Sequence, residues 1–349
     1  MVDQLDPFEY EKIWRPVRKD FKIFQEVYPH HRQYDELVTQ TELLAYLIRS
    51  YSVYEMTCGA LGHPGGSFSE AEILAVMFNY VLKFDPTNPD WLQRDVLYLS
   101  KCHACPAFYA ALALFGYFDL KDLKGYGSWD SFLESHPDSN TTPGIDIAGG
   151  SLGQIPGVAV GRALGIQRHG PDEGSRMVYV IIGDGECNEG SVWEAFMSAG
   201  HYRLDNLVFI IDNNKVQAKG FVAQDMSIEP LADKLAAFNV EPWETNNGHN
   251  VAELIDLFST LHTQRRGKPN AIILNTIKGK DIGMCELNPN WHTSAPREVS
   301  MAQDWLMELW ERDGRRLDVP EEFPRKLGEA ISIVPPVHDN PDQIVEKQA

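Results

Sequence analysis

Two polar turns, about thirty residues apart, carry side chains that could bind a metal ion and a phosphate group. A Gly-Asp-Gly triplet at 183–185 follows the apolar run 177–182, and Asn214 follows the apolar run 207–211. The carboxylate of Asp184 and the amide oxygen of Asn214 are hard ligands, suited to a Mg²⁺ or Ca²⁺ ion that also coordinates phosphate oxygens. The two glycines allow a diphosphate to come close to the backbone.

The segments around these turns predict how they are positioned. Both apolar runs are short, β-branched and bounded by polar residues, which is typical of buried parallel strands. Residues 189–202 place Val192, Phe196 and Ala199 at helical spacing, so a strand-helix-strand unit is predicted. The two turns then lie at the carboxyl ends of parallel strands, where open α/β sheets bind ligands. Because such turns also occur in ordinary crossovers, a purely structural unit is the alternative at this point.

Composition excludes several classes of protein. The chain has 349 residues, of which 43% are hydrophobic and 23% charged, as in globular proteins. Its net charge of −19 argues against nucleic acid or an anionic membrane as the main partner. Without a signal-like start or a run of eighteen apolar residues, a cytoplasmic protein is expected. The five cysteines form no disulfide framework, and the CHAC sequence at 102–105 lacks the second CxxC of a zinc site.

Periodicity outlines the remaining elements and predicts an α/β fold, with a mostly parallel sheet and helices on both faces. Helices are expected near 42–56, 69–84, 107–118 and 253–262, a further helix opens at 151–154, and strands are expected at 95–100 and 271–277. Residues 125–150 predict a long functional loop. We divide the chain into an N-terminal arm (1–37), one ligand-binding domain (38–312) and a charged, proline-rich C-terminal tail (313–349) whose last residues are expected to be disordered.

Three histidines lie in loops beside or near glycine: His63 in GHPGGS, His103 in SKCHACP and His292 in NPNWHT. A single histidine is more often a surface or structural residue than a catalytic one. The set, together with GDG and Asn-Asn, resembles the amino-terminal, diphosphate-binding half of transketolase. The resemblance covers about residues 38–300 and rests on GHPGGSFSEAEIL, LSKCHACPAFYAAL, HPDSNTTPGIDIAGGSLGQ and NTIKGKDIGMCELNPNWH.

The resemblance implies a thiamin-diphosphate-binding fold and a set of site residues. Asp184, Asn214 and the carbonyl of Val216 would hold Mg²⁺ or Ca²⁺. Glu189 would lie at a dimer contact linked to the cofactor, and His136 would touch the hydroxyl on the first carbon of the donor. Thiamin diphosphate would also be lined by His63, His103, Gly150, Leu152, Gly183, Gly185 and His292. The three loop histidines among these would donate to developing negative charge or transfer protons.

The implied reaction moves a two-carbon ketol unit from a ketose, expected to be phosphorylated, to an aldose. A complete transketolase also carries a pyrimidine-binding domain and a third, smaller domain, for which this sequence has no counterpart. We therefore expect a split enzyme whose partner subunit supplies them, in an assembly such as a two-plus-two heterotetramer.

Two departures from the family pattern bear on the site, and two other functions stay open. Cys102 replaces the usual glycine and adds a side chain near the cofactor pocket, which is expected to narrow the substrate range, and Thr293 stands where glycine is common. The first alternative is a decarboxylating relative of the deoxyxylulose-phosphate synthase or 2-oxoacid dehydrogenase type. The second is a non-catalytic subunit that keeps the fold.

Overall fold

A single five-stranded sheet forms the centre of the computed structural model, which describes residues 5–9, 31–169, 176–263 and 266–333. The spatial order of the strands is β1-β2-β3-β5-β4, and each neighbouring pair is parallel. Their bounds are β1 Val96–Leu99, β2 Val178–Gly183, β3 Leu207–Asn213, β4 Glu241–Glu244 and β5 Asn270–Asn275. The predicted parallel sheet is thereby confirmed.

Alternate residues of β1, β2, β3 and β5 face two different hydrophobic cores. In β2, Val178, Val180 and Ile182 belong to the smaller core, whereas Tyr179 and Ile181 belong to the larger one. This alternation follows from the two-residue period of a strand, and it leaves both faces of the sheet apolar. These four strands therefore read as hydrophobic runs in the sequence.

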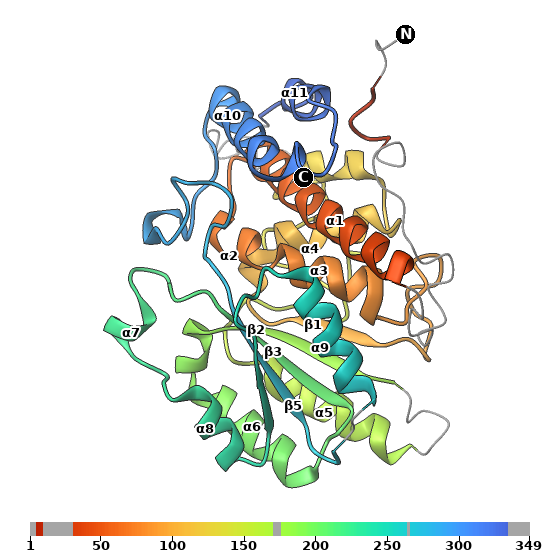
Figure 1. Ribbon diagram of the computed structural model, residues 1–349, viewed down its shortest axis with the longest axis vertical. Coiled ribbons are helices and arrows are strands. Elements are labelled where there is room, and N and C mark those ends of the chain that lie inside the picture. Colours follow the sequence, from red (N-terminus) through yellow and green to blue (C-terminus); the bar gives the residue numbers. More distant parts are fainter. Residues whose placement is uncertain (1–4, 10–30, 170–175, 264–265, 334–349) are drawn as a thin grey trace, which may run out of the picture.

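Helices cover both faces of the sheet (Figure 1). The smaller core packs under α5 (Ile155–Arg168), α6 (Gly190–Tyr202) and α8 (Leu231–Ala237). The larger core lies on the other face, around the long α1 (His31–Cys58). Its other helices are α2 (Pro64–Ser69), α3 (Ala71–Val76) with its π-helical extension (Met77–Val81), α4 (Cys105–Leu114), α9 (Val251–Thr263), α10 (Val299–Leu309) with its extension (Trp310–Gly314), and α11 (Glu322–Glu329).

The shorter elements lie mostly in loops near the ends of the strands. They are α7 (Val222–Asp225) and the 3₁₀ turns Cys102–Ala104, Leu120–Gly125, Gly185–Asn188 and Pro289–Trp291. Residues 126–154 contain no helix or strand, as predicted for the long loop, and α5 begins at Ile155, just after the predicted start.

Both ends of the predicted domain differ from the structure. Helix α1 begins at His31, inside the predicted arm, although residues 10–30 lie outside the described part. Helix α11 lies inside the predicted tail, and its Phe323 and Leu327 are buried in the larger core. The packed body therefore continues past residue 312, because these two side chains, four apart, share one helix face. The expected disorder of the last residues also falls outside the described residues.

Within the described ranges, no helix combines the length and the apolar character needed to cross a bilayer.

Candidate active site

The predicted metal ligands meet at the carboxyl ends of β2 and β3. In the sheet Gly183 is paired with Asp212, so Asp184 and Asn214 follow directly on two adjacent strands. The Asp184 carboxylate accepts hydrogen bonds from the backbone N–H groups of Gly185 (2.8 Å) and Lys215 (2.7 Å). Burial, with the nearby charge of Asp212, raises the pKa of Asp184 to about 6. A buried carboxyl group with a raised pKa is one that a cation would stabilise in its ionised form.

Four histidines form a cluster beside these oxygen atoms. The ring centroid of His63 lies 5.0 Å from that of His103, 5.6 Å from that of His292 and 6.2 Å from that of His136. The rings of His103 and His292 are 5.1 Å apart. These residues come from the loop before α2, the turn after β1, the long loop 126–154 and the turn after Trp291. The structure thus brings together all four histidines singled out from the sequence.

Lys278 connects the oxygen ligands to the histidines. Its ammonium group donates to the carbonyl of Val216 (2.7 Å) and contacts Nδ1 of His292 (2.8 Å). Its stem crosses Gly65, where a Cβ would lie 2.7 Å from Cε of Lys278. Glycine at position 65 therefore makes room for the lysine, for which the sequence had predicted no role.

Burial keeps the clustered imidazoles neutral. It lowers the pKa of His63 to about 4 and that of His292 to about 3, and nearby positive groups including Lys278 add to both shifts. The pKa values of His103 and His136 are also lowered, mainly by burial. Burial lowers the pKa of Lys278 to about 8, so it is mostly an ammonium at neutral pH. Because this ammonium donates to Nδ1 of His292, the ring proton of His292 is on Nε2.

The predicted cofactor-lining loop lies next to the cluster. A Cβ at Gly150 would lie 3.4 Å from Cδ2 of His136, and Gly150 has φ +154°. Leu152 is half-buried in the same loop, whereas Glu189 is exposed at the start of α6 and passes close to Gly153. Gly183 and Gly185 flank Asp184 at the end of β2.

Glu186, a residue with no role predicted from the sequence, ties three of these segments together. Its buried carboxylate accepts hydrogen bonds from the backbone N–H of Gly153 (2.8 Å), the backbone N–H of Gly183 (3.2 Å) and the hydroxyl of Ser100. It therefore connects the loop that is predicted to line the cofactor to the ends of β1 and β2. It follows GDG directly, which is the one signal that could have found it.

Cys102, which was expected to narrow the substrate range, is a buried packing residue, and its effect on substrate range stays a prediction. Its side chain is 1% exposed in the smaller core, and its thiol donates to the carbonyl of Leu99 (3.0 Å). Burial, together with the charge of Glu186, raises the pKa of Cys102 to about 12. The thiol is therefore a protonated packing group behind the loop at Gly149. Thr293, the other departure, is exposed.

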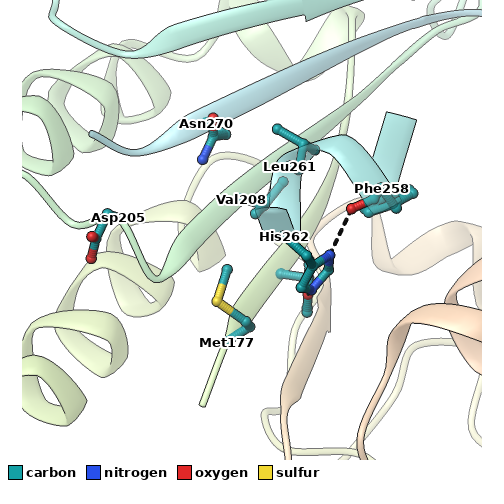
Figure 2. Close-up of a pocket in the computed structure, with 8 residues that line it drawn as sticks. Met177, Asp205, Val208, Phe258, Leu261, His262 and Asn270 are labelled. Carbon is teal, nitrogen blue, oxygen red and sulfur yellow. Dashed lines mark hydrogen bonds between the residues drawn. The ribbon is translucent and has the colours of Figure 1, made fainter. Parts of the chain in front are cut away.

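A small cavity lies at the amino ends of the strands (Figure 2). Its volume is about 10 Å³, and it is lined in part by Met177, Asp205 and Asn270, which lie beside the starts of β2, β3 and β5. His262 contacts the hydroxyl of Tyr179 (3.0 Å) and the carbonyl of Phe258 (2.7 Å) there. Both ring nitrogens of this histidine thus contact groups of the protein itself. The candidate site lies at the opposite, carboxyl ends of the strands.

Comparison with known proteins decides the family. Residues 40–328 match the family model described as transketolase, thiamine diphosphate binding domain. The chain belongs to the transketolase family. This confirms the resemblance stated from the motifs, and with it the class of transketolase-like transferases and the thiamin-diphosphate-binding fold.

Two relatives are themselves subunits of transketolases. A 6-deoxy-6-sulfo-D-fructose transketolase subunit of Clostridium sp. (strain MSTE9) is 43% identical over 244 residues, which cover 69% of this chain and 86% of that protein. An apulose-4-phosphate transketolase subunit of Actinobacillus succinogenes is 36% identical over 282 residues, which cover 80% of this chain and 99% of that protein.

Solved transketolases share the fold but are longer. The enzyme of Campylobacter jejuni superposes with a TM-score of 0.72 at 29% identity, covering 85% of this chain and 46% of that one. The enzyme of Leishmania mexicana gives 0.72 at 27% identity, covering 83% and 44%. This transketolase-family chain therefore spans less than half the length of these solved structures, but most of the two subunit-type relatives.

Proposed function

We propose that this chain is the diphosphate-binding subunit of a split, thiamin-diphosphate-dependent transketolase. One observation carries the proposal. Lys278 contacts a set of oxygen ligands on one side and a cluster of four neutral histidines on the other. The reaction moves a two-carbon ketol unit from a ketose to an aldose, with the partner subunit bound.

The residues present fit a divalent cation with a diphosphate. Asp184, Asn214 and the carbonyl of Val216 offer one carboxylate, one amide oxygen and one backbone oxygen, a hard-oxygen set suited to Mg²⁺ or Ca²⁺. No group of three or more His, Cys, Asp or Glu side chains in the described residues competes as a metal centre. Nδ1 of His63 is buried without a hydrogen-bond partner, which a ligand of this site would provide.

Each residue then has a defined task. Thiamin diphosphate, when bound, would supply the carbon nucleophile and the electron sink of the reaction. Nε2–H of His292 is free to donate to developing negative charge, because its Nδ1 is occupied by Lys278. His63 and His103 transfer hydroxyl protons of the substrates, and His136 contacts the hydroxyl on the donor's first carbon. Gly150, Leu152, Gly183 and Gly185 line the cofactor.

A partner subunit completes the site. We propose that it carries the pyrimidine-binding and C-terminal domains, and that two such pairs associate through the region of Glu189. Support comes from the two relatives named as subunits, which this chain covers over most of their length. The cytoplasmic location remains a prediction from the sequence.

The names of the relatives suggest the class of substrate. One acts on a sulfonated fructose and the other on a phosphorylated apulose, so both substrates are sugars that bear an anionic group. We propose a ketose donor of this kind, phosphorylated or otherwise anionic at the end distant from the carbonyl. The present chain contacts the reacting carbons, and the partner holds the anionic end.

The test is calorimetric titration of thiamin diphosphate with Mg²⁺. It is carried out on the full chain alone and on the chain mixed with the product of the neighbouring gene. We expect tight binding only in the mixture, abolished by Asp184→Ala, followed by turnover of ketose donors. Tight binding and turnover by the chain alone would refute the split assembly. Release of CO₂ from pyruvate by the assembled complex would support the decarboxylating alternative, and no binding in the mixture would support the non-catalytic one.

A further inference from the structure

A buried polar cluster lies directly beneath the proposed metal site. Its centre is the carboxylate of Asp212, which is fully buried at the end of β3. Oδ2 of Asp212 accepts hydrogen bonds from the ammonium of Lys101 (2.6 Å), the hydroxyl of Ser69 (2.6 Å) and the side-chain amide of Asn214 (2.9 Å). Oδ1 accepts from the hydroxyl of Thr276. Four donors around two oxygens require a carboxylate that is ionised and acts only as an acceptor.

Lys101 keeps this negative charge compensated. Its ammonium contacts Glu70 Oε2 (2.9 Å) and the carbonyl of Gly66 (3.2 Å) as well as Asp212, and its side chain is 3% exposed. Removing one partner of a buried ion pair leaves an uncompensated charge and is strongly destabilising. The cluster is therefore a fixed point within the fold.

The contacts of Asn214 show how this buried cluster orients a group of the site. The side-chain amide N–H₂ of Asn214 donates to Asp212 Oδ2 and to the hydroxyl of Ser69 (3.3 Å). Both acceptors lie on the protein side, so the amide nitrogen must point there and the oxygen Oδ1 must point the other way. Oδ1 faces the turn, where it accepts from the backbone N–H of Val216 (3.2 Å). An amide turned by 180° would present N–H donors to a cation.

We propose that Asp212 is a positioning residue that orients Asn214 so that its oxygen, and not its nitrogen, faces the divalent cation. Ser69 assists by accepting from the same amide. The inference rests on the proposed function, because it requires the cation to bind at Asp184 and Asn214. The same role explains why several segments are held at one carboxylate. Each of these segments lies within a few residues of a group at the site, and they contribute Ser69, Lys101, Asp212 and Thr276.

The test measures Mn²⁺ affinity by the EPR signal of free Mn²⁺, at a fixed concentration of thiamin diphosphate, with the full chain and its partner subunit. Asp212→Asn replaces one acceptor oxygen by an amide that competes for the same hydrogen bonds. We expect it to weaken Mn²⁺ binding about 10- to 100-fold, the usual effect of removing a group that orients a metal ligand. Thr276→Val is the matched control. It removes the contact on Oδ1 and leaves the three contacts on Oδ2, so Mn²⁺ affinity should change less than twofold even if the melting temperature falls.

The outcomes separate the inference from the proposed function. If Asp212→Asn folds and binds Mn²⁺ like wild type, or if Thr276→Val weakens binding equally, the positioning role is refuted. If Asp212→Asn does not fold, Ser69→Ala decides: a loss of affinity of twofold or more supports the inference, and a smaller change refutes it. If the wild-type complex itself binds no Mn²⁺ with thiamin diphosphate, both the inference and the proposed function fall.

Discussion

Replacing Gly149 by alanine is expected to destabilise the chain because of Cys102. A Cβ at position 149 would lie 2.3 Å from Sγ of Cys102 and 2.7 Å from Cδ1 of Ile155. Both neighbours are buried, at 1% and 2% exposure, so neither can move freely into solvent. The backbone of Gly149 is outside the left-handed region, so the cost comes from packing alone. Overpacking of a buried site typically costs about 1–3 kcal/mol, and we expect a value near 2 kcal/mol.

A double-mutant cycle with Cys102→Ala tests this cause. The single variant Cys102→Ala loses the thiol and its hydrogen bond to Leu99, which should cost about 1 kcal/mol. In that background the clash with Sγ is absent, so Gly149→Ala should cost about 1 kcal/mol less than in the wild type. The free energy of unfolding is measured from urea curves followed by tryptophan fluorescence. Strict additivity of the two substitutions would refute the reasoning, because it would mean that Cys102 does not limit the space at Gly149.

Two further predictions concern buried ionisable groups. Arg49 is 1% exposed and pairs with Glu72 (2.6 Å) and Asp281 (3.3 Å), so Arg49→Met should lower the free energy of unfolding by about 3–5 kcal/mol. The exposed pair of Arg325 and Glu321 is the control. Arg325→Met should change the free energy of unfolding by less than about 1 kcal/mol in the same urea assay. Equal losses in the two variants would contradict the prediction. Burial lowers the pKa of His63 to about 4, so between that value and the usual 6.5 the unfolded chain binds more protons and stability falls as the pH is lowered. Urea midpoints at pH 7 and pH 5 should therefore differ less in His63→Gln than in wild type, and an unchanged difference would count against a buried neutral imidazole.

Much of the fold could be predicted because its signals are local. The strands that became β2, β3 and β5 are apolar runs buried on both faces, and the helix between β2 and β3 keeps a clear period. Because the carboxyl ends of parallel strands lie at the same end of the sheet, Asp184 and Asn214 could then be placed near each other without further information. These steps need only neighbours in sequence.

Among the elements that were not predicted, β4 and α11 have local signals that are weak or misleading. Strand β4 reads Glu-Pro-Trp-Glu, has no buried run and lies at the edge of the sheet, where proline is tolerated. Helix α11 lies in a charged segment with proline at position 324, and Phe323 and Leu327 are the large apolar side chains that it buries. In both, packing against a neighbouring element determines the structure more than propensity does.

The buried charges of the site could not be derived from the sequence at all. Lys101 and Asp212 are 111 residues apart, and a lysine after a strand is ordinarily expected in solvent. The grouping of His63, His103, His136 and His292 came from the family resemblance, since no spacing rule connects four separate loops.

The glycines of the GHPGGS segment illustrate how sequence and structure complement each other. In isolation, a glycine-rich loop suggests close approach of a ligand to the backbone. In the structure, Gly65 faces the stem of Lys278, and a Cβ at Gly66 would lie 3.6 Å from Nε2 of His103. At Gly65 a Cβ would occupy the space of the Lys278 stem, whereas at Gly66 the contact with His103 is an ordinary one. Gly65 therefore allows Lys278 to reach both Val216 and His292, and that double contact holds the proposed metal ligands beside the proposed proton-transfer groups.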